Sequence, residues 1–244
     1  MRQYEKFFYP ESEFGGFTDI DGTIIFYTRV NALLQPSFTV LDVGCGNGSH
    51  IDGATGFKKN LITLQGKAAR VIGIDVAEEA TANQFIDEFR LIHGQQWPLD
   101  DNSIDLIVCD NVLEHIHEPD GFFSEIARVL RQGGVLCLRT PNLYNYIALA
   151  AVLIPNRLHG KVVAFAQNGR KEEDVFPTFY RCNSIGKLKR MLRKHGFADR
   201  VVYGYEAEPS YMSFSWLAYF FGVVHQKFVP SCFRATLFVF ARKG

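Results

Sequence analysis

The chain has 244 residues, of which 47% are hydrophobic and 21% are charged, so it can bury a core as one large domain or as one domain with insertions. Basic and acidic residues both number 26, and the formal net charge is therefore zero. A neutral chain lacks the positive field that attracts nucleic acid, and we expect no nucleic-acid partner.

The cysteines and the N-terminus indicate a cytoplasmic protein. The five cysteines are scattered and without paired spacing, which is typical of reduced thiols and predicts no zinc site. The N-terminus carries acids and aromatics where a signal peptide needs an unbroken apolar run. No apolar stretch is long enough to cross a bilayer. We expect a cytoplasmic location, with peripheral attachment at the inner membrane surface as an alternative.

The N-terminal segment contains a short motif with two interpretations. Asp19 and Asp21 lie in the pattern D-x-D-G-T, which is similar to the nucleophile motif of haloacid-dehalogenase-type phosphatases. That chemistry needs the motif at the end of a buried strand, but residues 13–18 are a poor strand, and no convincing lysine and paired-aspartate motif follows. We expect instead that Asp21 or Thr23 caps a helix over 24–34.

The first buried strand is predicted over 39–43, a short apolar run rich in β-branched residues. It leads into three alternating glycines at 44–48, which allow a tight turn and a close approach of the backbone to a ligand. A helix that begins at such a turn points its amides at that ligand. Asp42 precedes the turn, and Ser49 stands where a dinucleotide fingerprint needs its third glycine.

A second strand, over 70–75, ends in an acid, and residues 50–70 before it are expected to form a helix or loop. In a doubly wound sheet, ligands lie beyond the carboxyl ends of the strands. The carboxylate of Asp75 is therefore placed to accept hydrogen bonds from ribose hydroxyls. The alternative is that Asp75 caps a helix over 77–89.

Two further strands are predicted at 106–110 and 135–139, with a turn over 97–105 before the first. A helix over 120–130 separates them and is expected to end at the glycine pair that follows. These elements indicate an α/β protein.

The second half of the chain is less regular. Apolar residues over 144–165 are interrupted by proline and glycine, a helix is predicted over 184–195, and strands are predicted at 200–205 and 235–242. Between those strands lies the aromatic segment 211–230, which is too short to span a bilayer. We expect an insertion that packs on the core; the alternatives are an apolar substrate cleft or a membrane interface.

In this order, the blocks over 40–140 resemble the class I S-adenosylmethionine-dependent methyltransferases, and among them the type-11-like small-molecule enzymes. The resemblance implies a Rossmann-like, doubly wound sheet of seven strands in the order 3-2-1-4-5-7-6, with the last strand antiparallel and with helical insertions. It implies an N-terminal helical lid over 1–35, a methyltransferase domain over 36–244, and substrate-capping insertions at 144–180 and 208–232.

The resemblance also implies S-adenosylmethionine as the methyl donor and S-adenosylhomocysteine as the product. The residues expected to bind the donor are Asp42, Gly44, Cys45, Gly46, Asn47, Gly48, Asp75, Val76, Gly94, Gln95, Asp110 and Asn111. The acid that commonly meets the adenine amino group aligns with His93 here. We therefore assign the adenine contact to the neighbouring residues 94–96.

A sulfonium methyl group is a strong electrophile, so the enzyme mainly aligns the reacting atoms and excludes water, and a general base assists an oxygen or nitrogen nucleophile. We expect His115 and Asp110 to be catalytic because they follow the strand whose end faces the methyl group. The alternative is that Glu114 and His115 only brace the loop. The candidates on the substrate side are Tyr27, His159, Tyr180 and Arg181, and those for the lid are Thr23, Tyr27 and Arg29.

Some relatives carry the pattern E-x-x-E-H at this position, and in the small-RNA end methyltransferases these groups help to bind magnesium. Here Asn111 stands in place of the first glutamate. A neutral oxygen is a poor substitute in a hard-cation site, so we expect no metal.

The expected function is the transfer of a methyl group to an oxygen or nitrogen atom, or to a carbon atom, of a small, partly hydrophobic or lipid-like acceptor. A catalytically inactive module that binds S-adenosylmethionine is one alternative, and a phosphatase acting through Asp19 and Asp21 is another. Segment 211–230 is a candidate for peripheral membrane contact. The oligomeric state is not predicted.

Overall fold

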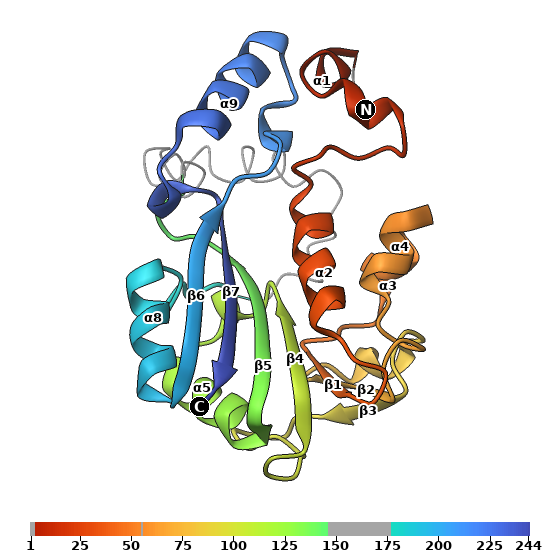
Figure 1. Ribbon diagram of the computed structural model, residues 1–244, viewed down its shortest axis with the longest axis vertical. Helices are drawn as coiled ribbons and strands as arrows, with labels where there is room; N and C mark the ends of the chain where they lie inside the picture. The colour runs from red at the N-terminus through yellow and green to blue at the C-terminus, as the bar shows by residue number, and fades with distance from the viewer. Residues whose placement is uncertain (1–2, 55, 146–176) are drawn as a thin grey trace.

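The structure, a computed structural model, describes residues 3–54, 56–145 and 177–244 (Figure 1). In these ranges seven strands form one sheet in the order β3-β2-β1-β4-β5-β7-β6, as expected. Strand β7 is antiparallel to both neighbours, and the other pairs are parallel. The strands are β1 Thr39–Val43, β2 Arg70–Asp75, β3 Glu88–Leu91, β4 Ile104–Asp110, β5 Leu130–Pro141, β6 Phe197–Tyr205 and β7 Thr236–Lys243.

Helices cover both faces of this sheet (Figure 1). On one face α5 and α8 bury side chains such as Phe123 and Leu188, and on the other α2, α3 and α4 bury side chains such as Phe26 and Ile62. The described helices are α1 Gln3–Phe8, α2 Gly22–Leu33, α3 Ser49–Asp52, α4 Gly56–Ile62, α5 Pro119–Val129, α8 Ile185–Lys194 and α9 Trp216–Phe228. None of these helices is long and apolar enough to cross a membrane.

Helix α2 begins where its sequence predicts. The Asp21 carboxylate accepts hydrogen bonds from the amides of Thr23 and Ile24, at 2.9 and 3.0 Å, and so caps the helix. Its other oxygen accepts from Lys58 Nζ at 2.8 Å. Asp21 therefore serves as a helix cap, and the D-x-D-G-T motif does not follow a strand, as a phosphatase nucleophile would require.

Two local predictions were wrong. The stretch 77–89 is not a helix but a short 3-10 helix, Glu78–Ala82, followed by the edge strand β3. Every residue of β3 is only partly buried, and Glu88 pairs with Arg70 and Arg90, so the strand lacks an apolar signal. Helix α5 ends at Val129, before the glycine pair, because β5 already begins at the next residue.

The aromatic segment does not pack where we expected. Helix α9 buries Tyr219 and Val223 against Tyr9 and the N-terminal segment, in a cluster separate from the two that flank the sheet. The N-terminal and the aromatic segments, which lie at opposite ends of the chain, thus meet at one end of the molecule (Figure 1).

Candidate active site

The glycine turn joins β1 to α3 at the carboxyl edge of the sheet. Gly44, Gly46 and Gly48 all have positive φ, at 69°, 51° and 81°, a conformation that favours glycine. A Cβ on Gly44 would lie 2.4 Å from Val112 Cγ2, and one on Gly48 would lie 2.8 Å from Asn83 Oδ1. A Cβ on Gly46 would meet nothing within 4 Å. The outer glycines are therefore required by packing, and the central one leaves its space to a ligand.

Two side chains fix the shape of this turn. The amide of Asn83 donates to the carbonyls of Cys45 and Gly46, at 3.0 and 3.1 Å. The Asp75 carboxylate accepts from the amides of Gly46 and Ala77, at 2.9 and 3.0 Å. Because a carboxylate oxygen has two lone pairs, Asp75 can still accept hydrogen bonds from a ligand.

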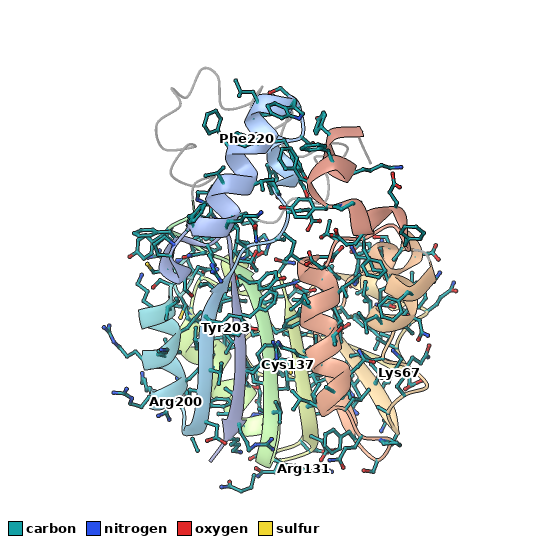
Figure 2. All side chains as sticks on the ribbon, turned by 45° about the horizontal axis from the view of Figure 1, so that its top comes forward. Lys67, Arg131, Cys137, Arg200, Tyr203 and Phe220 are labelled. Atoms are coloured by element: carbon teal, nitrogen blue, oxygen red, sulfur yellow. The ribbon has the colours of Figure 1, made fainter. Side chains whose placement is uncertain are left out.

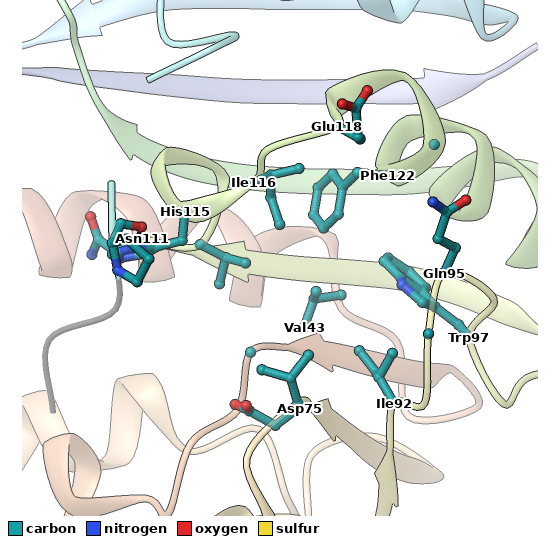
Figure 3. Close-up of a pocket in the computed structure, with 16 residues that line it drawn as sticks. Val43, Asp75, Ile92, Gln95, Trp97, Asn111, His115, Ile116, Glu118 and Phe122 are labelled. Carbon is teal, nitrogen blue, oxygen red and sulfur yellow. Dashed lines mark hydrogen bonds between the residues drawn. The ribbon is translucent and has the colours of Figure 1, made fainter. Parts of the chain in front are cut away.

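A largely apolar cavity of about 420 Å³ opens beside Asp75 (Figure 3). Its walls come from the ends of β1 and β2, the loops after β3 and β4, and the first turn of α5. The side chains that line it include Val43, Ile92, Trp97, Val112, Ile116 and Phe122, with Gln95, Asn111, His115 and Glu118 as polar groups. Such a cavity suits a flat, mostly apolar ring with a polar edge.

A second cavity, of about 390 Å³, is lined by residues 44–47 of the glycine turn. Gly44 and Asn111 line both cavities, so the two meet at this point. The second cavity is polar and is lined by Thr23, Tyr27, Asp42, Cys45, Gly46, Asn47, Ser49, His50, Lys58, Asp110 and Arg139, among others. A ligand that bridges the two cavities would have an apolar ring at one end and charged groups at the other.

Carboxylates dominate the junction. Asp42, Asp75 and Asp110 lie at or near the ends of three neighbouring parallel strands, β1, β2 and β4. Burial, reinforced by the charges of Asp110 and Asp75, raises the pKa of Asp42 from 3.8 to about 7. The site therefore favours a cation, and binding of one would shift Asp42 toward its ionised form.

Arg139 balances part of this negative charge. Its Nε donates to Asp110 Oδ1 at 2.6 Å, its Nη2 donates to Asp110 Oδ2, and its Nη1 donates to Thr23 Oγ1 at 3.0 Å. Burial opposes the charge of the guanidinium, but Asp110 raises the pKa of Arg139 above its ordinary value. The Tyr27 hydroxyl completes the group and donates to Asp110 Oδ2 at 3.3 Å.

The loop after β4 carries a second polar group, next to the apolar cavity. His115 Nδ1 lies 3.0 Å from the carbonyl of Pro177, which can only accept a hydrogen bond. The neutral ring therefore carries its basic lone pair on Nε2. Glu114 is buried, which raises its pKa, and it accepts a hydrogen bond from Thr140 Oγ1 at 3.0 Å.

The residues predicted to bind the donor lie together around the two cavities. The apolar cavity is lined by Asp75, Val76, Gly94 and Gln95. The polar cavity is lined by Asp42, Asp110 and residues 44–47 of the glycine turn. Gly48 lines neither cavity and supports the turn from outside. Cys45 is buried.

The substrate candidates are more dispersed. Tyr27 reaches Asp110, Tyr180 is half-buried and donates its amide to the Glu114 carbonyl at 3.2 Å, and Arg181 is exposed. His159 lies outside the described residues.

Sequence reasoning missed three residues. Arg139, Asn83 and Val112 were not singled out, although each is a main contact of the site. Arg139 offered one signal, since a charged residue near the carboxyl end of a buried strand usually serves a site.

Comparisons with known proteins agree with this geometry. Residues 41–138 match the family described as "Methyltransferase domain". A probable S-adenosylmethionine-dependent methyltransferase of Mycolicibacterium smegmatis is 37% identical over 108 residues, which are 42% of this chain and 38% of that protein. A ubiquinone/menaquinone biosynthesis C-methyltransferase of Campylobacter jejuni is 30% identical over 113 residues, or 44% and 47% of the two chains. The chain thus spans less than half the length of these relatives.

The fold has solved counterparts. A SAM-dependent methyltransferase from Archaeoglobus fulgidus superposes with a TM-score of 0.56 and 17% sequence identity, over 99% of this chain and 100% of that one. At this identity the match concerns the fold alone.

Proposed function

We propose that the chain, whose residues 41–138 match a methyltransferase domain, is a class I S-adenosylmethionine-dependent methyltransferase and transfers a methyl group from S-adenosylmethionine to an oxygen, nitrogen or carbon atom of a small, partly hydrophobic acceptor. The observation that carries the proposal is the junction of an apolar and a polar cavity at Gly44 and Asn111, beside three carboxylates. The shape and charge of this junction match a donor with an adenine ring at one end and an amino acid at the other.

Each end of the donor has fitting residues. In the proposal, the apolar cavity holds the adenine between Val112 and Ile92, with Gln95 near its polar edge. Asp75 accepts from the ribose hydroxyls. The polar cavity holds the amino acid end, and the backbone of Gly46 approaches it closely.

The donor supplies an electrophilic methyl group whose sulfur loses its positive charge on transfer. The protein then has to hold the acceptor atom in line with that methyl group and to exclude water. His115 is the proposed base for an oxygen or nitrogen acceptor, with Nδ1 directed at Pro177 and Nε2 4.0 Å from Glu114 Oε1. Asp110 is paired with Arg139 and is therefore proposed to position Tyr27 and the donor rather than to take a proton.

The acceptor is proposed to be a lipid-like or otherwise partly apolar small molecule. One relative carries the name of a ubiquinone/menaquinone biosynthesis C-methyltransferase, and the formal charge of this chain is zero, which does not favour nucleic acid.

Calorimetry tests the proposal. Wild-type protein should bind S-adenosylmethionine, and Asp75→Ala should weaken binding by about 10- to 100-fold, because a charge-assisted hydrogen bond contributes roughly 1.5–3 kcal/mol. Asp199→Ala removes an exposed acid on β6 and should change nothing. Incubation with labelled donor and a cell extract should then label a small molecule. Binding without any transfer would favour an inactive binding module, and no binding would refute the proposal.

A further inference from the structure

The loop after β4 carries a buried carboxylate, that of Glu114, whose side chain is only 6% exposed. A carboxylate is costly to bury unless it is paired and hydrogen-bonded. Its Oε2 accepts a hydrogen bond from Thr140 Oγ1 at 3.0 Å, and Thr140 in turn accepts one from Asn183 Nδ2 at 2.6 Å. Thr140 lies near the end of β5, three residues beyond Cys137, which Figure 2 labels on that strand. One carboxylate oxygen is therefore fixed by a chain of buried polar groups.

The backbone of Glu114 is fixed as well. Its carbonyl accepts hydrogen bonds from the amides of Phe179 and Tyr180, at 2.7 and 3.2 Å. Tyr180 makes this contact with a φ of 50°, a left-handed conformation that is rare for a bulky residue. Such strain persists only where the surrounding contacts impose it, and it is common at functional sites. Residues 177–183 are thus held against the loop after β4 by contacts to Glu114 and its neighbour.

The second carboxylate oxygen of Glu114 lies beside His115. Oε1 is 4.0 Å from His115 Nε2, and within the part of the chain that the structure describes it accepts no hydrogen bond. Because Nδ1 of the neutral ring donates to the Pro177 carbonyl, Nε2 carries the lone pair. A separation of 4.0 Å is too long for a hydrogen bond but short enough for charges to interact strongly. A lone pair and a carboxylate oxygen at this distance repel each other, and a proton on Nε2 would turn the repulsion into attraction.

The charges of the two residues act on each other. Burial raises the pKa of Glu114, and a positive charge on His115 lowers it again. Asp110, a second carboxylate near this loop, raises the pKa of Glu114. Asp110 itself is paired with Arg139, which donates to both of its oxygens. Of the two carboxylates, Glu114 is therefore the one that can respond to a proton on His115.

We propose that Glu114 is a positioning residue that orients His115 and stabilises the proton that His115 takes from the acceptor. The inference rests on the proposed function and adds a second residue to its base. The acceptor atom loses its proton to His115 Nε2 and takes the methyl group, and the sulfur keeps the electron pair of the broken carbon–sulfur bond. The imidazolium then lies beside the Glu114 carboxylate until its proton passes to water. Glu114 itself does not touch the acceptor.

A double-variant cycle tests how Glu114 acts. The assay is the initial rate at which labelled methyl groups are transferred to a cell extract at saturating donor. Glu114→Gln keeps an oxygen for Thr140 but loses the charge, and should lower the rate at least about tenfold while the affinity for the donor stays within about twofold. Glu114→Gln/His115→Gln should be no slower than His115→Gln alone, because Glu114 acts through His115.

Glu206 offers a matched control. Its side chain is 5% exposed, it accepts a hydrogen bond from the amide of Ala235 at 2.6 Å, and its Oε1 lies 4.0 Å from Nδ1 of His225. Glu206 lines neither cavity, so Glu206→Gln should leave the rate unchanged. A wild-type rate in Glu114→Gln, or independent losses that multiply in the double variant, would overturn the proposal. So would equal losses in Glu114→Gln and Glu206→Gln, because removal of any buried charge would then explain them.

A second measurement needs no acceptor. Carbon-13 NMR of the Glu114 carboxyl group follows its protonation, and His115→Gln should raise the pKa of Glu114 further, because the imidazolium that lowers it is gone. His117→Gln, which changes an exposed neighbour, should leave that pKa unchanged. An unchanged pKa of Glu114 in the His115 variant would overturn the inference even in a protein that binds the donor. A wild type that does not bind the donor would instead refute the proposed function, and with it the role of the pair in transfer.

Discussion

The guanidinium of Arg139 donates to both carboxylate oxygens of Asp110, with 2.6 Å between Nε and Oδ1, and thereby joins the ends of β4 and β5 beneath the polar cavity. Both side chains are largely buried, with 13% and 15% of their surface exposed. The pair holds the negative charge of Asp110 in a fixed place beside the point where the two cavities meet.

Removal of one partner from this pair should be costly. Arg139→Gln leaves the carboxylate of Asp110 buried without its cation, and the free energy of unfolding should fall by about 3–5 kcal/mol. The double variant Arg139→Gln/Asp110→Asn should recover much of that loss, which urea denaturation would measure. A double variant no more stable than the single one would show that Arg139 acts on something other than Asp110.

Gly46→Val should abolish binding of S-adenosylmethionine, because the new side chain would enter the space left open at the turn. Positive φ also strains a β-branched residue by about 1–2 kcal/mol. Gly66→Val is the matched control, since Gly66 has φ 78° and likewise no atom within 4 Å of a Cβ, but does not line either cavity. Calorimetry should find normal affinity in the control; equal loss in both variants would point to backbone strain instead.

Asp42 should make stability fall as pH rises. Its folded pKa of about 7 lies above its ordinary value of 3.8, so the folded state holds the proton more tightly. The stabilisation is complete below pH 4 and is lost as pH rises to about 7, by at most about 4 kcal/mol, less where water in the cavity screens the charge. Asp42→Asn should remove this part of the pH dependence in urea titrations from pH 4 to 8. If the free energy of unfolding changed with pH in the same way in Asp42→Asn and the wild type, the assignment to Asp42 would be contradicted.

Binding of the positively charged donor should displace the proton from Asp42. A cation bound beside Asp42 favours its ionised form, so binding at pH 6 to 7 should release a proton. Calorimetry in two buffers with different ionisation enthalpies measures this release directly, and Asp42→Asn should lower it. Proton release that is equal in the variant and the wild type would assign the titration to another group.

His115→Gln should lower methyl transfer by about 10²- to 10⁴-fold and leave the affinity for the donor within about twofold, if the acceptor is an oxygen or nitrogen atom. His117→Gln, an exposed neighbour, serves as the control. A variant with the wild-type rate would leave His115 with the role of bracing the loop through Pro177.

Much of the fold and the glycine turn could be predicted from the sequence because their signals are local. The run 39–43 is mostly apolar, and the glycines at 44–48 adopt positive φ, so each segment carries its own physical signal. Strand β3 could not be recognised, since it is an edge strand with charged residues and partial burial. Its place depends on pairing with β2, which no short window of sequence contains.

The side-chain partners of the site were harder to predict for the same reason. Asn83 lies 37 residues from Gly46 and Arg139 lies 29 residues from Asp110, and only the folded sheet brings each pair together. The acids at strand ends were predictable because parallel strands end at the same edge. The sequence did not predict which of these acids would be paired with an arginine. It also did not predict which of them would have a raised pKa.

The contact between Tyr4 and Ser213 joins positions that are 209 residues apart. During synthesis on the ribosome, helix α1 therefore cannot dock until the residues around Ser213 have emerged, and it has to wait while the sheet assembles. Helix α1 should be among the last segments to acquire protection from hydrogen exchange, and among the first to lose it on unfolding.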